Sequence, residues 1–246
     1  MKPWHEDDSF WKDVEDVLFP ERRREIAAGE IENVIARLDL KPGSHILDLC
    51  CGVGRHSIEL AKRGFRVTAV DRTKKYLDAA RERASKEGLG IEFVHEDMRE
   101  FMRANAYDAA INMYTSFGYF RDPADDEKVL GNLYRSIRPG GRLLMDLMGK
   151  EILARMFKER DWYEGDGFII LEEREVKESW SWIENRWIIL RDGERKDLHL
   201  SHRLYSAAEL QGLMKSAGFR TTEAFGDLEG GPYNHQAKRL VVVAKK

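Results

Sequence analysis

The chain has 246 residues, of which 42% are hydrophobic and 35% charged, and its formal net charge is −3. This apolar content can offset the entropy of ordering, which excludes disorder as the main state, and the acidic balance argues against a dedicated grip on nucleic-acid backbone. No apolar run approaches the ~18 residues of a membrane span, and the first residues lack an apolar signal core, so we expect no signal peptide.

The two cysteines, Cys50 and Cys51, are adjacent in the sequence. A disulfide framework needs separated partners, and the chain has no CxxC or Cys/His metal spacing. We therefore expect a reducing, cytoplasmic compartment, no metal site and no membrane association.

Residues 1–40 are predicted to form a helical segment. Its aromatic side chains are Trp4, Phe10, Trp11 and Phe19. They fit an amphipathic helix, or alternatively a lid over a glycine-rich cleft. Val34, Ile35 and Leu38 indicate a further helix directly before the first strand.

Residues 41–149 alternate between short apolar strands and amphipathic helices. The predicted strands span 45–49, 65–70, 91–95, 107–114 and 142–147, and the predicted helices span 55–63, 74–86 and 122–138. The run 107–114 is nearly continuously apolar, which is typical of a strand buried on both faces of a parallel sheet. Alternating strands and helices predict an α/β fold with a doubly wound, mostly parallel sheet and right-handed crossovers.

The pattern changes over residues 150–205, where strands follow one another without long helices between them. Asp192-Gly193 is a hairpin signal. We therefore predict an antiparallel β insertion. The doubly wound pattern returns over residues 206–246, where Ser206 and Glu209 form a capping box that opens a helix and an apolar run at 240–244 forms the last strand.

A glycine-rich loop follows the first predicted strand. Gly52 and Gly54 let the backbone approach a ligand closely just before a helix begins. Asp71 ends the second strand, where a carboxylate can accept hydrogen bonds from both hydroxyls of a ribose. Asp97 ends the third strand, where an adenine would lie. These positions indicate an adenosine-containing ligand.

Asp48 and Ser57 argue against a dinucleotide. The dinucleotide fingerprint has glycine or alanine where this chain has Ser57. A carboxylate at Asp48 would repel a pyrophosphate by about 1 kcal/mol in water-like surroundings. Asp48 favours a ligand with a cationic part, such as an adenosine joined to an amino acid and a sulfonium. Alternatively, Asp48 binds the backbone of its own turn.

These residues resemble the motifs of class I S-adenosylmethionine-dependent methyltransferases. The matching segments are 48–54, Asp71, 96–98 and the turn 138–142. The resemblance covers residues 40–150 and returns at 206–246. It implies a seven-stranded sheet in the order 3-2-1-4-5-7-6 with the last strand antiparallel. The stretch 116–120 is similar to small-molecule members, including amino-sugar and glycine-type N-methyltransferases.

The resemblance implies S-adenosyl-L-methionine as the cofactor. It places the glycine loop beside the methionine part, Asp48 near its ammonium, Asp71 at the ribose, and Asp97 with Met98 at the adenine. Further candidates lie at the carboxyl end of the fourth strand, in the crevice where such sheets bind ligands. The residues expected to bind the cofactor are Asp48, Gly52, Gly54, Arg55, Asp71, Asp97, Met98, Asn112 and Met113.

Four side chains are candidates for contact with the methyl acceptor. Tyr114 and Ser116 leave the sheet at the crevice, although a packed loop is the alternative. His202 or Tyr205, at the end of the insertion, can orient or deprotonate an acceptor, unless they form a strand end facing solvent.

The acceptor is predicted to be a small molecule. Amino-directed nucleic-acid methyltransferases carry a [DN]PP[YFW] motif after the fourth strand, whereas residues 112–115 contain no proline. We expect a nitrogen or oxygen acceptor covered by residues 150–205, and no nucleic-acid partner. Two alternatives are an NAD(P)-dependent oxidoreductase and a non-catalytic module that binds S-adenosylmethionine.

Overall fold

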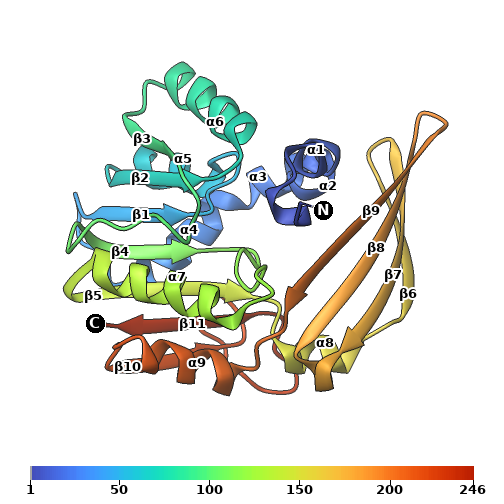
Figure 1. Ribbon diagram of the computed structural model, residues 1–246. Coiled ribbons are helices and arrows are strands. Elements are labelled where there is room, and N and C mark those ends of the chain that lie inside the picture. Colours follow the sequence, from blue (N-terminus) through green and yellow to red (C-terminus); the bar gives the residue numbers. More distant parts are fainter. Residues whose placement is uncertain (1) are drawn as a thin grey trace.

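A seven-stranded sheet forms the centre of the computed structural model, which describes residues 2–246 (Figure 1). Its strands are β1 (His45–Leu49), β2 (Arg66–Asp71), β3 (Ile91–His95), β4 (Tyr107–Asn112), β5 (Ile137–Leu147), β10 (Thr221–Phe225) and β11 (Leu240–Lys245). The order is β10-β11-β5-β4-β1-β2-β3. β1 to β5 are parallel, whereas β11 is antiparallel to both of its neighbours. The predicted sheet and strand order are therefore confirmed.

Helices cover both faces of this sheet and bury two separate apolar cores. The helices are α4 (Ala27–Leu38), α5 (Arg55–Lys62), α6 (Lys74–Lys86), α7 (Pro123–Ser136), α8 (Lys150–Met156) and α9 (Ala207–Ser216). α4, α5 and α6 contribute Val34, Leu60 and Leu77 to one core. α7 and α9 contribute Leu130 and Met214 to the other. Side chains alternate between these faces along β4, which explains its nearly continuous apolar run.

β4 is shorter than predicted and β5 is longer. β4 ends at Asn112 because Tyr114 and Thr115 both adopt positive φ, 59° and 58°, which turns the chain out of the sheet. β5 begins at Ile137 rather than at residue 142, and a register shift between the two strands accommodates the additional residues.

The second sheet is antiparallel and has four strands in the order β6-β7-β8-β9. They are β6 (Arg160–Gly165), β7 (Phe168–Lys177), β8 (Trp182–Arg191) and β9 (Glu194–Arg203). The 3-10 turn η2 (Glu178–Trp180) connects β7 to β8. The hairpin at Asp192-Gly193 is confirmed, with both residues at positive φ. β6 was not predicted, since its Trp162 and Tyr163 are exposed and give no clear alternation.

The N-terminal segment lies between the two sheets (Figure 1). It contains η1 (Trp4–Glu6), α1 (Asp8–Asp13), α2 (Glu15–Leu18) and α3 (Glu21–Glu25). The aromatic stretch is helical but forms several short helices rather than one continuous amphipathic helix. The helical geometry is interrupted at Val14, at Phe19 and at Pro20, which has no N–H to donate.

The segment is held by an apolar cluster with the second sheet. In that cluster Phe10, Val14 and Val17 pack against Phe168, Ile170 and Ile189. The same segment thereby reaches the carboxyl ends of the central strands. No helix within residues 2–246 is long and apolar enough to cross a membrane.

Candidate functional site

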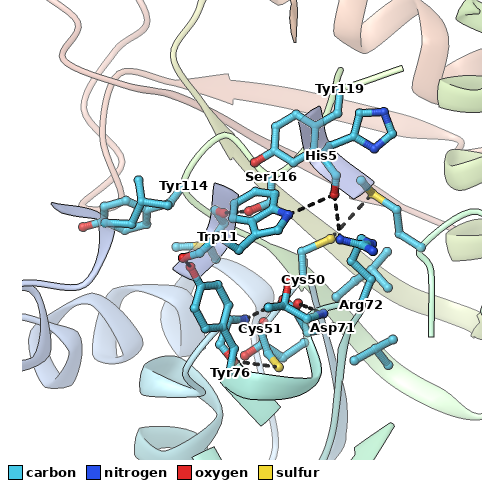
Figure 2. A pocket seen from close by; sticks show the side chains of 18 of the residues that line it. His5, Trp11, Cys50, Cys51, Asp71, Arg72, Tyr76, Tyr114, Ser116 and Tyr119 are labelled. Carbon is cyan, nitrogen blue, oxygen red and sulfur yellow. Dashed lines mark hydrogen bonds between the residues drawn. The ribbon is translucent and has the colours of Figure 1, made fainter. Parts of the chain in front are cut away.

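A cavity lies where the carboxyl ends of β1, β2 and β4 meet the N-terminal segment (Figure 2). Its open space is about 130 Å³, less than the roughly 300–1,000 Å³ of typical ligand pockets. Trp11 and Phe19 line it from the N-terminal side, opposite the glycine loop. A Cβ on Gly52 would lie 2.8 Å from the Phe19 ring. The aromatic side chains therefore narrow the cavity directly above the loop.

Asp71 fastens the glycine loop to the end of β2. Its two carboxylate oxygens accept hydrogen bonds from the backbone N–H of Gly52 and of Thr73, each at 2.8 Å. Burial raises the pKa of Asp71, and these backbone donors oppose that shift. Each oxygen has further lone pairs, so the carboxylate can also accept hydrogen bonds from a ligand.

Asp48 is 2% exposed and accepts a hydrogen bond from the Ser57 hydroxyl on α5. Burial raises the pKa of Asp48 to about 6. Ser57 is the residue that departs from the dinucleotide pattern, and the structure explains it as the donor to Asp48. The partner of Asp48 is thus a helix side chain, and the cavity contains two buried carboxylates beside one glycine loop.

Asp97 and Met98 line the end of the cavity next to β3. Arg99 donates to both oxygens of Asp97, at 3.0 and 2.8 Å, and binds Glu6 at 2.8 Å. Burial would raise the pKa of Asp97, but Arg99 outweighs it and the pKa is lowered. Sequence reasoning missed Arg99, although its position two residues after Asp97 was the available signal.

A buried charged cluster that sequence reasoning also missed lies behind the opposite end of the cavity, which its members Arg55, His56 and Tyr114 line. Glu30 of α4 binds Arg55 at 3.1 Å, His56 at 2.9 Å and Arg239 at 3.0 Å, and it accepts a hydrogen bond from the Tyr114 hydroxyl. Burial would raise the pKa of Glu30, but these partners lower it to about 2. Burial lowers the pKa of His56 to about 4. Glu30 is therefore an anion and His56 is neutral at pH 7.

Asp146 of β5 holds the strained turn after β4. Its carboxylate accepts from the Tyr114 N–H at 2.9 Å, and its backbone carbonyl accepts from the Thr115 N–H at 2.9 Å. Asp146 is 1% exposed and is paired with Arg239 through two nitrogens of the guanidinium. This pairing stabilises positive φ at two non-glycine residues and orients the Tyr114 ring into the cavity wall.

Comparisons with known proteins identify the family. Residues 46–141 match the family described as methyltransferase domain. The chain is a class I S-adenosyl-L-methionine-dependent methyltransferase. This assignment excludes the two alternatives considered from the sequence, an NAD(P)-dependent oxidoreductase and a non-catalytic binding module. The cofactor is S-adenosyl-L-methionine.

Relatives extend along most of this methyltransferase. The putative methyltransferase YqeM of Bacillus subtilis is 28% identical over 207 residues, covering 82% of this chain and 83% of the relative. A glycine/sarcosine N-methyltransferase of Aphanothece halophytica is 26% identical over 227 residues, covering 89% and 83%. The crystal structure of an S-adenosylmethionine-dependent methyltransferase from Clostridium acetobutylicum has a TM-score of 0.80 at 17% identity and covers 97% of this chain and 98% of that chain. The last match shows a shared fold that includes the second sheet.

Most of the predicted site residues of the methyltransferase line the cavity. They are Asp48, Gly52, Arg55, Asp71, Asp97, Met98, Met113, Tyr114 and Ser116. Gly54 and Asn112 support the cavity from behind. A Cβ on Gly54 would lie 2.9 Å from Ala80 of α6, and the Asn112 amide donates to the carbonyls of Leu49 and Ser116.

His202 and Tyr205 are not among the residues that line the cavity. Tyr205 packs beside Phe117, and its hydroxyl donates to Asp126 at 2.7 Å, because the chain re-enters the core of the large sheet there. His202 lies on β9 opposite Ile183. The sequence suggested that the end of the insertion brings these two side chains to the acceptor. In the structure His202 lies within β9 and Tyr205 follows that strand, and neither side chain reaches the cavity.

Proposed function

We propose that this methyltransferase transfers a methyl group to the nitrogen or oxygen of a small-molecule acceptor. The cofactor part of the proposal is carried by the pair of buried carboxylates, Asp48 and Asp71, on either side of the glycine loop. These two hydrogen-bond acceptors fit a ligand with hydroxyl groups and a cationic part, and they disfavour a diphosphate. The acceptor part is supported by relatives that act on small molecules, such as the glycine/sarcosine N-methyltransferase of Aphanothece halophytica.

In this proposal the cofactor extends along the cavity from the β3 end to Tyr114. Asp71 binds the ribose hydroxyls, and Asp97 with Met98 contacts the adenine. Asp48, Gly52, Arg55 and Met113 surround the methionine part, which Gly54 and Asn112 support from behind. Asp48 can favour the ammonium group because it remains acidic enough to ionise near neutral pH.

The chain's own contribution to the reaction is alignment and exclusion of water, which can supply ~7–11 kcal/mol. The bound cofactor provides an electrophilic methyl group, and the acceptor's lone pair forms the new bond as the methyl–sulfur bond breaks and its electron pair stays on sulfur. The Tyr114 hydroxyl is engaged by Glu30, and the Ser116 hydroxyl donates to the Met113 carbonyl at 2.9 Å. These engagements favour an amine that arrives neutral, because such an acceptor needs no base to attack.

An oxygen acceptor would require a base, and His5 is the histidine best placed for that task. It lines the cavity beside Tyr119, and burial lowers its pKa, which keeps the imidazole neutral. His5→Ala therefore distinguishes the two acceptor types. An oxygen-directed enzyme loses the rise of its rate with pH, whereas a nitrogen-directed enzyme retains it.

In this proposal the insertion of residues 150–205, which forms the second sheet, covers the acceptor together with the N-terminal segment of residues 1–40. We infer that Trp11 and Phe19 move outward when ligands bind, since the cavity is narrow where they lie over the glycine loop. Residues 41–149 and 206–246 form the cofactor-binding core and its completion.

The test is transfer from methyl-labelled cofactor into a cell extract that has been separated into low-mass, protein and nucleic-acid fractions. We expect label in the low-mass fraction and its loss with Asp71→Asn. Label confined to protein or nucleic acid would contradict a small-molecule acceptor.

A further inference from the structure

The strand β6 forms an open edge of the second sheet. It pairs with β7 at the end of the strand order, and Figure 1 shows it on the outer side, away from the central sheet. One residue before β6, the Glu159 carbonyl accepts a hydrogen bond from the Arg174 N–H at 2.7 Å. Such bonds recur at every second residue of an antiparallel pair, so the backbone groups of Arg160, Trp162 and Glu164 point away from β7.

The other three sheet edges are engaged by side chains of the same protein. At each of them a backbone carbonyl accepts a hydrogen bond: Phe93 of β3 from Arg81, Thr222 of β10 from Gln211, and Ser201 of β9 from Trp4. Within residues 2–246, the edge of β6 has one such bond, from the Trp162 N–H to the partly exposed carboxylate of its neighbour Asp161 at 3.0 Å. A hydrogen bond in contact with water is readily exchanged for one to another strand.

Large apolar side chains are exposed beside this edge. Trp162 is 60% exposed, and Leu171, opposite it on β7, is 38% exposed. The other face of the sheet packs on the N-terminal segment through Phe168 and Ile170. An exposed apolar pair next to open backbone groups is typical of a surface where another chain binds.

The charges of β6 indicate which chain that is. Trp162 lies midway between Arg160 and Glu164, which are exposed and have opposite charges. The three side chains share one face, because neighbours along a strand alternate. Antiparallel pairing of two copies about a two-fold axis at Trp162 places each Arg160 opposite Glu164 of the other copy. Charges on an edge strand ordinarily repel other strands, whereas their order here makes β6 complementary to itself.

The same residues select the register of this pairing. With Trp162 opposite itself, the outward backbone groups of both strands meet in hydrogen-bonded pairs, and the two indole rings form a favourable cross-strand contact. A shift of two residues is the smallest that keeps the hydrogen-bonding pattern. It would place Trp162 opposite Arg160 or Glu164 and break both Arg160–Glu164 pairs.

We propose that a second copy of this chain binds β6, with Trp162 at the two-fold axis, and that the two four-stranded sheets join into one sheet of eight strands. One strand from each copy forms the contact, which is smaller than a standard interface, so the dimer should depend on protein concentration. No residue of β6 lines the cavity, so the inference is independent of the proposed function.

The experiment measures the molecular mass by sedimentation equilibrium over about 1 µM to 1 mM protein. Glu164→Arg places an arginine opposite Arg160 in both pairs. Arg160→Glu does the converse, although Arg160 also lies 3.7 Å from Glu173 of its own chain. The double variant Arg160→Glu/Glu164→Arg exchanges the two charges and restores both pairs. Thermal unfolding verifies that each variant is folded.

The matched control is Lys86→Glu, at the exposed end of α6, which changes the net charge as much as Arg160→Glu. The wild type and this control should reach twice the mass of the chain at high concentration. Each single reversal on β6 should raise the dimer Kd at least tenfold, because the two-fold axis makes every substitution act twice. The double variant should return the Kd to within threefold of the wild type.

Trp162→Cys tests the register separately. Opposed residues of a hydrogen-bonded antiparallel pair have Cα atoms about 5.5 Å apart, which a disulfide can bridge. Mild oxidation should therefore link two copies of this variant covalently. Tyr163→Cys is the control, since Tyr163 would lie opposite Asp161 of the other copy and should form little crosslink. The wild type gives the background from Cys50 and Cys51.

Three results would overturn the inference. A wild type that keeps the mass of one chain at about 1 mM excludes the dimer and leaves a strand of a different protein as the occupant of this edge. A dimer that survives both single reversals lies elsewhere on the molecule. Dissociation of the single variants without recovery in the double variant, or crosslinking of Tyr163→Cys in place of Trp162→Cys, excludes the pairing about Trp162.

Discussion

Asp71→Asn tests the central feature of the site with almost no change in shape. The carboxylate of Asp71 accepts from the N–H groups of Gly52 and Thr73, each at 2.8 Å. An amide keeps one acceptor oxygen and presents an NH2 group to the other donor, so one buried N–H loses its partner. The expected cost is about 1–3 kcal/mol of folding stability.

The same substitution removes a charged acceptor for the ribose hydroxyls. Each lost charge-assisted hydrogen bond is worth about 1.5–3 kcal/mol, which corresponds to a tenfold or greater rise in Kd. The assay is calorimetric titration with S-adenosylhomocysteine, at a temperature where thermal unfolding shows that the variant is folded.

The matched control is Asp126→Asn. Asp126 is likewise buried and accepts a hydrogen bond from Tyr205, but it does not line the cavity. The Asp126→Asn variant should lower the folding stability by a similar amount and leave the Kd for S-adenosylhomocysteine unchanged. If Asp71→Asn binds S-adenosylhomocysteine with the wild-type Kd, the assignment of Asp71 to the ribose is refuted.

Three further predictions concern the glycine loop and the buried charged cluster. Gly52→Ala should lower the S-adenosylhomocysteine affinity and the melting temperature, because Gly52 has a φ of 55° and a Cβ would lie 2.8 Å from Phe19. The control is Gly29→Ala, at an exposed position within α4, which should stabilise the folded protein by about 0.5–1 kcal/mol. A Gly52→Ala variant with wild-type melting temperature and affinity would contradict this. Arg239→Met leaves Asp146 as a buried, unpaired carboxylate, so thermal unfolding should show a loss of about 3–5 kcal/mol that Arg239→Lys partly restores; equal loss in both variants would show that charge is not the cause. The pKa of His56 is lowered to about 4, so the unfolded chain binds a proton near pH 6.5 that the folded chain does not. The wild type should therefore lose stability relative to His56→Gln as the pH falls from about 6.5 to 4, and parallel stability curves for the two proteins would exclude this linkage.

The sequence by itself determined those elements whose signals are local. The helix predicted over residues 74–86 has the same bounds in the structure, because its apolar residues recur at helical spacing and Gly88 follows it. Asp192-Gly193 predicted the β8–β9 hairpin because a two-residue turn requires residues that tolerate positive φ. The glycine loop and Asp71 were recognisable because parallel strands bring their carboxyl ends to one edge of a sheet.

The tertiary structure decided which side chains gather at that edge of the central sheet. Glu30, Arg55, Tyr114 and Arg239 form one buried cluster although 209 residues separate the first from the last, and no local pattern predicts which charges a fold will pair. The N-terminal aromatic residues reach the cavity because Phe10, Val14 and Val17 pack on the apolar face of the second sheet and hold the segment there. Secondary structure follows from neighbours along the chain, whereas the composition of a buried site follows from which distant side chains must share one low-dielectric volume.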